Sequence, residues 1–486
     1  MASEEINSIE ELVKYFSEYD EEENIRNNIE AINLNFITNN QGGSLNSELK
    51  KKYSSKPKIY KRVKVGKSTN SFSILSKFPN EYPFDDQIIS KKLNISYPTI
   101  QDNYFLEESH VVSEKLQSHI DYMSALYSNY YKVLISRTNE ESTTPIYIVG
   151  RIFICEEAGI ETISIENRGK VRLDIDNITE YALFPGQIVM VKGTSDTYTF
   201  IVSEIITELF KPSPTLPESQ FLVGLVSGPF STVDLDYSIF IAFLDKICTE
   251  VNALIIIGPI VDNDNEIIQE GIINIESLDI KNGSYEDIFN NIQGHLIKLK
   301  EEESCEIIYV PHTREIQHIF PLPMPGLNYT FETKYKLSTD SPEKSLYYPP
   351  SPAKISIDGT RIHVVPYDFI HEIIQPAVLK SQKLINKISM SLLQTMNQHS
   401  YLPIMPNSLP VEYSKYEHFI FEQPPHILIV QSKFPVQFES VPGILCVKST
   451  SFAEGNKIGN YSIINVAGGG RSVNECIGVK NYRINS

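Results

Sequence analysis

Apolar positions change their spacing along residues 221–266, and this change predicts a strand, a helix and a second strand. The runs FLVGLVSGPF and ALIIIGPIVDND are nearly continuous and rich in β-branched residues, as in strands buried on both faces. Between them, apolar residues recur every three or four positions, which is the spacing of an amphipathic helix. Such a unit is typical of a parallel sheet, in which the loops at the carboxyl ends of the strands carry the chemistry. Each run ends at a Gly-Pro pair, so these two loops are the first candidate site.

Later apolar segments predict further strands of the same α/β part. They are CEIIYV at 305–310, KISID at 354–358, TRIHVVP at 360–366, HILIVQ at 426–431 and GILCVK at 443–448. Between them, Leu384, Ile388, Leu392 and Met396 lie on one side of a predicted helix that covers the sheet. The proline-rich segments 318–352 and 402–413 show no period, and we expect them to form loops at the rim, where partner contacts are common.

Upstream, shorter apolar segments predict a helix followed by a small barrel. The helix is expected over 107–132, and five β-branched segments follow it: IYIVGRIFIC, TISIEN, VRLDID, QIVMVKGT and YTFIVSEII. Five short strands separated by turns fit a barrel of the oligonucleotide-binding (OB) type. After a turn at Pro185 and Gly186, either Ile188 and Met190 or Val189 and Val191 face the barrel interior.

An OB barrel raises the question of nucleic-acid binding. Surfaces that bind single strands combine stacking aromatic side chains with basic ones. The predicted strands supply three aromatic and four basic residues: Tyr147, Phe153, Phe200, Arg151, Lys170, Arg172 and Lys192. Few cations and a net charge of -18 favour a protein-binding barrel, with DNA contact weak or indirect.

Charge is distributed unevenly ahead of the barrel. Residues 1–30 carry ten acidic and two basic side chains, with apolar residues at helical spacing, which predicts a short amphipathic helix or a solvated acidic tail. Residues 50–67, KKKYSSKPKIYKRVKVGK, hold nine Lys or Arg and no acid. This strip indicates a nuclear import signal or a nucleic-acid contact, or else a solvated linker.

Cysteine spacing and hydropathy exclude two further classes. The five cysteines lie far apart and form no CxxC pair or zinc-type spacing, which is typical of reduced thiols: Cys155, Cys248, Cys305, Cys446 and Cys476. No apolar run approaches the roughly 20 residues that cross a bilayer, so we expect no membrane association.

Six stretches resemble, in the same order, the B (second, regulatory) subunits of eukaryotic DNA polymerase alpha. They are LFPGQIVMVKG at 183–193, SGPFS at 227–231, GPIVDND at 258–264, YEDIFNNI at 285–292, YVPHTREIQH at 309–318, and HILIVQSKFPVQF followed by GILCVKSTSFAEGNKIGNYSIINV. One such stretch would be weak support, whereas six in order are a specific signal.

The resemblance implies an α/β plus all-β fold. One part is expected to be an inactivated calcineurin-like phosphoesterase domain, with sheet layers covered by helices, and the other an OB-fold barrel. The expected domains are an acidic helical segment at 1–45, a basic flexible linker at 46–104, the OB domain with its preceding helix at 105–210, and the phosphoesterase-like domain at 211–486.

An active phosphoesterase of this kind holds two dications between carboxylates and imidazoles. By the resemblance, the corresponding positions here are degenerate: Gly228, Phe230, Pro259, Asp262, His312, Ser432 and Phe434. Pro259 stands where a carboxylate would bridge the metals, and proline offers no ligand atom. Only Asp262 and His312 are ligand types, and we expect a turn residue and a structural histidine. The sequence therefore predicts no catalytic residue, no metal and no other cofactor.

The resemblance implies a non-catalytic scaffold of the polymerase alpha-primase complex, acting in initiation of DNA replication in the nucleus. Its expected partner is the C-terminal domain of the catalytic subunit, with the primase subunits joined through the complex. Two alternatives remain open at this point. One is a B subunit of DNA polymerase delta or epsilon, and the other is an active metal-dependent phosphoesterase or nuclease.

Overall fold

The computed structural model of the protein describes 72–87, 92–100, 104–105, 108–157, 160–196, 198–211, 215–327, 346–381, 386–432, 438–454 and 457–484. The expected acidic helix, the basic strip 50–67 and Phe434 lie outside these ranges, and so does most of the proline-rich segment after 327.

The strand, helix and strand expected at 221–266 form the centre of the first sheet. β10 (Phe221–Ser227) and β11 (Ala253–Ile257) pair in parallel, and α5 (Ser238–Ile247) connects them. β14 (Glu306–Val310) extends the parallel part, whereas the strands on the other side are antiparallel to their neighbours. The order is β1 (Phe72–Phe78), β24 (Ile477–Ile484), β23 (Asn460–Val466), β10, β11 and β14. The sheet is therefore mixed, with its parallel strands at one side.

A second six-stranded sheet packs face to face on the first. Its order is β19 (Phe438–Val441), β20 (Ile444–Ser449), β18 (Ile427–Gln431), β16 (Thr360–Val365), β15 (Ala353–Ile357) and β2 (Ile95–Ser96). Alternate residues of the two sheets, among them Val223, Ile255 and Ile429, fill one core between them. Because both faces of β10 and β11 are buried, these strands lack the apolar-polar alternation of half-exposed strands.

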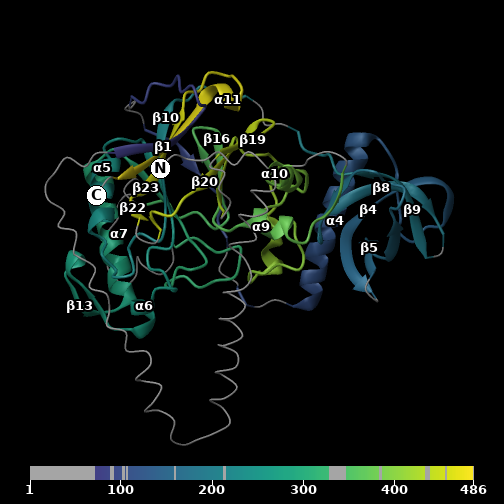
Figure 1. Cartoon of the computed structure of the whole chain (residues 1–486), viewed down its shortest axis with the longest axis horizontal. Helices are drawn as coiled ribbons and strands as arrows, with labels where there is room; N and C mark the ends of the chain where they lie inside the picture. The colour runs from purple at the N-terminus through teal and green to yellow at the C-terminus, as the bar shows by residue number, and fades with distance from the viewer. Residues whose placement is uncertain are drawn as a thin grey trace, which may run out of the picture. The chain divides into compact units, whose positions relative to one another are not determined.

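Helices cover the outer faces of both sheets. α5 and α7 (Tyr285–Glu302) pack on the first sheet, and α9 (Phe369–Ile374) and α10 (Lys387–Asn397) pack on the second (Figure 1). α7 begins at a capping box, in which the Ser284 hydroxyl accepts the Asp287 N–H and the Asp287 carboxylate accepts the Ser284 N–H. The layers run helix, sheet, sheet, helix.

Short elements complete this part of the chain. They are α6 (Glu266–Glu270), η1 (Glu276–Leu278), η3 (Tyr413–His418), α11 (Val473–Cys476), and the strand pairs β12 (Ile273–Ile275) with β13 (Ile280–Gly283) and β21 (Ala453–Glu454) with β22 (Lys457–Ile458). No helix in the described ranges combines the length and apolar character needed to cross a bilayer.

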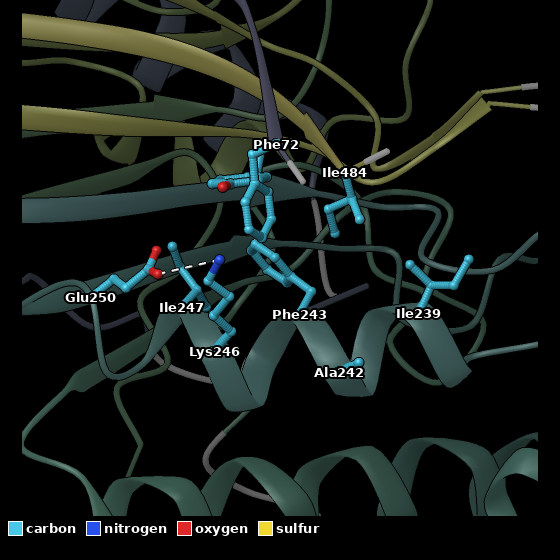
Figure 2. Close-up of a pocket in the computed structure, with 9 residues that line it drawn as sticks. Phe72, Ile239, Ala242, Phe243, Lys246, Ile247, Glu250 and Ile484 are labelled. Atoms are coloured by element: carbon cyan, nitrogen blue, oxygen red, sulfur yellow. Dashed lines mark ion pairs between the residues drawn. The ribbon is translucent and has the colours of Figure 1, made fainter. Parts of the chain in front are cut away.

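The prediction of a flexible linker over 46–104 is wrong for its second half, which contains β1 and β2. β1 pairs with β24, and β2 pairs with β15, so both belong to the sheets of the α/β part. Figure 2 shows Phe72 of β1 pointing toward α5, where the Lys246 ammonium lies 3.3 Å from its ring centroid. Lys246 also pairs with Glu250 at 3.5 Å. The sequence did not predict β1 because it is a half-exposed edge strand whose partner lies about 400 residues away along the chain.

The barrel predicted from five segments is present and closed. Its strands run in the order β3 (Ile135–Ser136), β4 (Ser142–Glu157), β5 (Ile160–Glu166), β6 (Lys170–Asp174), β9 (Thr199–Ile206) and β8 (Ile188–Ser195), and β4 also pairs with β8. The two-residue β3 was not predicted. Val189 and Val191 fill the interior, whereas Ile188 and Met190 pack outward against α4 (Ser109–Tyr131). This settles the alternative that the sequence left open.

One strand crosses the expected boundary between the two domains. β7 (Tyr181–Leu183), from the barrel segment, pairs with β17 (Val378–Lys380) of the later part of the chain. Residues 69–486 form one compact unit, so the boundary at 210/211 does not separate two independent bodies.

Candidate functional site

The loops after β10 and β11 meet at their Gly-Pro turns. The Gly228–Pro229 and Gly258–Pro259 peptide bonds are both cis. A Cβ atom at Gly228 would lie 2.1 Å from the carbonyl oxygen of Pro259, so only glycine fits this contact. The structure thus brings together two of the predicted positions, Gly228 and Pro259, and neither side chain can bind a metal.

Phe230, a third predicted position, packs in the core between the sheet and α5. Its side chain is fully buried, and its ring stacks on Phe240 of α5 with 4.1 Å between the ring centroids. An aromatic ring is a good core residue and has no metal-binding atom. This position therefore contributes to packing.

A buried carboxylate occupies the turn after β11. Glu315 Oε2 accepts the backbone N–H of Ile260 at 2.5 Å and the hydroxyl of Tyr309 at 2.7 Å, and Oε1 accepts the Val261 N–H at 3.1 Å. Burial raises the pKa of Glu315 to about 7, against the three hydrogen bonds that favour its ionised form. The sequence did not indicate this role, because a single acidic residue in a loop has no periodic pattern.

His312 and Asp262 are both committed to contacts within the protein. His312 Nδ1 accepts the Arg314 N–H at 3.0 Å, so its Nε2–H donates to Gln431 Oε1 at 2.6 Å. Asp262 accepts the Asp264 N–H at 3.2 Å and lies 3.5 Å from Arg314 Nη1. Burial lowers the pKa of His312 to about 4 and raises the pKa of Asp262.

We call these residues after β10, β11, β14 and β18 the loop cluster. Its donor atoms do not suit a two-metal site, because both nitrogens of His312 and both oxygens of Glu315 already have protein partners. Within the described residues, no group of three or more His, Cys, Asp or Glu side chains could hold a metal ion. Ser432 follows β18 directly and is the last described residue before a gap. The arrangement ties four loops together.

A second set of polar contacts joins the barrel to α10. The side chain of Gln398 accepts the Ile188 N–H at 2.7 Å and donates to the Ile188 carbonyl at 2.9 Å. Asn397 Oδ1 accepts the N–H groups of Leu209 at 2.9 Å and Phe210 at 2.7 Å. We call this set the barrel junction. Because these amides are buried and hydrogen-bonded to backbone groups of the barrel segment, they fix the barrel against the end of α10.

An exposed apolar patch is formed by the segment that precedes α4 and the loop after β14. Phe105 and Ile319 are 69% and 68% exposed, and the Phe105 ring stacks on Phe320 with 6.1 Å between the centroids. Tyr104 also packs on Phe320, and its hydroxyl donates to the Pro323 carbonyl. Aromatic residues gathered at a surface are typical of protein contacts.

Known families match both parts of the chain. The family of DNA polymerase alpha/epsilon B subunits matches residues 223–438, and the family described as the OB domain of the DNA polymerase alpha B subunit matches residues 113–209. The second match confirms the predicted type of barrel.

Curated relatives carry a consistent name. The chain is similar to the DNA polymerase alpha B subunit of Mus musculus, with 21% identity over 72% of this chain and 59% of that protein. It is similar to the protein of the same name from Schizosaccharomyces pombe, with 24% identity over 73% and 66% of the two chains. The matched region spans little more than half of the first of these relatives.

Proposed function

Because the chain belongs to the family of DNA polymerase alpha/epsilon B subunits, we propose that it is the non-catalytic scaffold subunit of a DNA polymerase alpha-primase complex. Its partner is then the C-terminal domain of the catalytic subunit, and primase joins through the complex. The alpha type is favoured over delta or epsilon by the OB-domain match and by the names of the relatives.

The loop cluster is the observation that carries the non-catalytic role. In a metallophosphoesterase, the loops after these strands present carboxylates and imidazoles to two metal ions. Here the same loops are linked by Glu315 and His312, and Gly228 and Pro259 contribute no ligand atom. The four layers of helix and sheet support the proposal that this part of the chain is an inactivated calcineurin-like phosphoesterase domain.

The proposed role as a binding platform for the catalytic subunit follows from the barrel junction and the exposed patch. A permanent subunit interface buries more than about 2,000 Å² and includes apolar and aromatic residues. The barrel and the α/β part, held together at Gln398 and Asn397, offer such a surface, with Phe105 and Ile319 exposed beside it. Few cations on the barrel keep any DNA contact weak or indirect.

Coexpression tests whether the chain binds the catalytic subunit. The chain and the C-terminal domain of the catalytic subunit should copurify as a one-to-one complex that survives moderate salt, because buried apolar contacts are screened little. Residues 105–210 alone should bind that domain much more weakly than the full chain. Failure of the full chain to bind at micromolar concentration, together with tight binding of single-stranded DNA, would refute the scaffold role.

Metal analysis tests the loss of catalysis. The purified chain incubated with Mn²⁺ or Zn²⁺ should hold no stoichiometric metal and should not hydrolyse a phosphodiester. Two ions per chain, with hydrolysis abolished in Asp262→Ala, would instead establish an enzyme.

A role in replication places the protein in the nucleus. We assign import to the basic residues 50–67, and a reporter fused to residues 45–70 should concentrate in the nucleus. Charge reversal of Lys50, Lys51, Lys52, Lys61 and Arg62 should disperse the reporter. A reporter that is cytosolic before any substitution would leave these residues as a solvated linker.

A further inference from the structure

A groove of about 440 Å³ lies between α4 and the segment that contains η3. Its lining includes three carboxylates, from Glu114, Glu417 and Glu422. Lys115 also lines the groove, and it pairs with Glu417 at 3.1 Å. No salt bridge within the described residues joins Glu114 or Glu422 to a cation, although the ammonium of Lys354, which donates to the Ile420 carbonyl, lies near Glu417 and Glu422. Three carboxylates against the two ammonium groups of Lys115 and Lys354 leave the groove with a small excess of negative charge.

A buried histidine on the wall of the groove lacks one hydrogen bond. His119 is 2% exposed, and its Nε2 lies 3.3 Å from the carbonyl oxygen of Gln398. Because a carbonyl only accepts, Nε2 carries the hydrogen and Nδ1 is left as an acceptor. Nδ1 has no partner within the described part of the chain. An unsatisfied buried acceptor is costly, which favours a donor supplied from outside the chain.

All of these groups call for the same ligand chemistry. Two carboxylates and an imidazole lone pair accept hydrogen bonds and attract positive charge, which an ammonium or a guanidinium supplies. Tyr122 and Ile420 add apolar walls on which the methylene stem of a long basic side chain can pack.

We infer that this groove binds a lysine or arginine side chain from a basic segment of the polymerase partner. The inference rests on the proposed function, since it identifies the kind of partner segment that docks beside the barrel junction. The exposed patch at Phe105 adjoins the same short helix, because Lys415 of η3 lies 5.4 Å from the ring centroid of Tyr104. A segment that fills the groove and continues across η3 would therefore place apolar residues on this patch.

Charge reversal of the groove tests the inference. The full chain carrying Glu114→Lys and Glu422→Lys is compared with a control carrying Glu180→Lys and Glu270→Lys, which changes net charge equally at exposed sites away from the groove. Affinity for the C-terminal domain of the catalytic subunit is measured at low and high salt. The groove variant should bind about tenfold more weakly at low salt, and its affinity should rise with salt, because a charge pair has become a repulsion that salt screens. The control should stay within about twofold.

The His119 contact has its own variant. His119→Phe keeps a ring in the wall but removes both the Nδ1 acceptor and the N–H that donates to the Gln398 carbonyl, and it should weaken the same complex several-fold with no loss of salt sensitivity. Thermal unfolding of each variant verifies that it is folded.

The outcomes separate the two proposals. If wild type and groove variant bind the partner equally, the groove inference is wrong and the scaffold role stands. If the wild-type chain does not bind the partner at all, the scaffold role falls and the groove inference falls with it. A groove variant that changes only self-association of the chain would assign the groove to a second copy and overturn the inference.

Discussion

Glu315 shows how one buried carboxylate joins separate segments of the loop cluster. Its carboxylate accepts three hydrogen bonds, two from backbone N–H groups of the turn after β11 and one from the Tyr309 hydroxyl of β14. A side chain whose two oxygens both accept backbone N–H groups cannot be exchanged for an amide without placing an NH₂ group against one of them. The loop cluster is therefore a structural crosslink that needs a carboxylate.

Glu315→Gln is the first prediction at this scale. The variant should lose about 1–3 kcal/mol of unfolding free energy, because a buried donor is left unpaired. Chemical denaturation at about pH 8, where Glu315 is ionised, measures this loss, and Glu270→Gln at an exposed position serves as control. Equal stabilities of the two variants would contradict a crosslinking role.

The pH dependence of stability provides a second test of the contribution of Glu315. Its folded pKa of about 7 lies above the ordinary value of 4.5, so its contribution is present below pH 4.5 and is lost as pH rises to about 7. The wild-type chain should show this loss in Tm between pH 5 and 7.5, and Glu315→Gln should not. An identical dependence of Tm on pH in the two proteins would contradict this contribution of Glu315.

His312 should act in the opposite direction. Burial lowers its folded pKa from 6.5 to about 4, so the unfolded chain binds the extra proton first and stability falls as pH drops from 6.5 to 4. His312→Asn should flatten this acid limb in a Tm series, whereas exposed His110→Asn should not. An unchanged acid limb in His312→Asn would assign it to other buried histidines, such as His119.

Sequence patterns predicted these residues unevenly. Gly228 and Pro259 were assigned to the candidate site through the resemblance, because the absence of a ligand atom can be read from the residue type. Glu315 and Gln431 were not, since their roles depend on which loops meet in space. Phe230 was assigned to a ligand position through the resemblance, and its apolar ring packs in the core on α5.

At the scale of elements, strong periodicity predicted the helices and central strands. The edge strands have weak periodicity and were not predicted. α4, β10, β11 and the barrel strands each contain a clear apolar pattern and lie close to their predicted ranges. β1 and β2 lie next to a basic, polar stretch, and their pairing partners are distant in the chain. Long-range pairing is the information that a local pattern lacks.

A substitution in β1 tests whether this edge strand stabilises the sheet. Phe72→Ala should lower the unfolding free energy by about 2 kcal/mol, because it removes a half-buried ring and its cation contact with Lys246. Leu75→Ala on the same strand should cost less than about 0.5 kcal/mol, since Leu75 is 48% exposed. Equal effects in chemical denaturation would mean that β1 adds little to the fold.

At the scale of the whole molecule, the barrel and the α/β layers act as one body through a few buried amides. Gln398 and Asn397 end α10 and satisfy backbone groups of the barrel, while Gln187 donates to Gln394 at 2.9 Å. Such side chains do not contribute to hydrophobic patterns, which is why the sequence predicted two separate domains with a boundary at 210/211. A scaffold benefits from this rigidity, because binding then orders fewer parts of the chain.

Gln398→Leu tests this coupling. The variant keeps a similar volume but leaves the N–H and carbonyl of Ile188 unpaired, at a cost of about 2 kcal/mol or more. The barrel should exchange its backbone hydrogens faster in hydrogen-exchange mass spectrometry, while β10 and β11 stay protected. Affinity for the catalytic subunit's C-terminal domain should fall as well, because the barrel and the α/β layers that would bind it are no longer held in a fixed arrangement. Gln423→Leu, at an exposed position, is the matched control. If Gln398→Leu exchanges and binds like that control, the barrel is held by apolar packing on α4 alone, and the barrel junction has no part in partner binding.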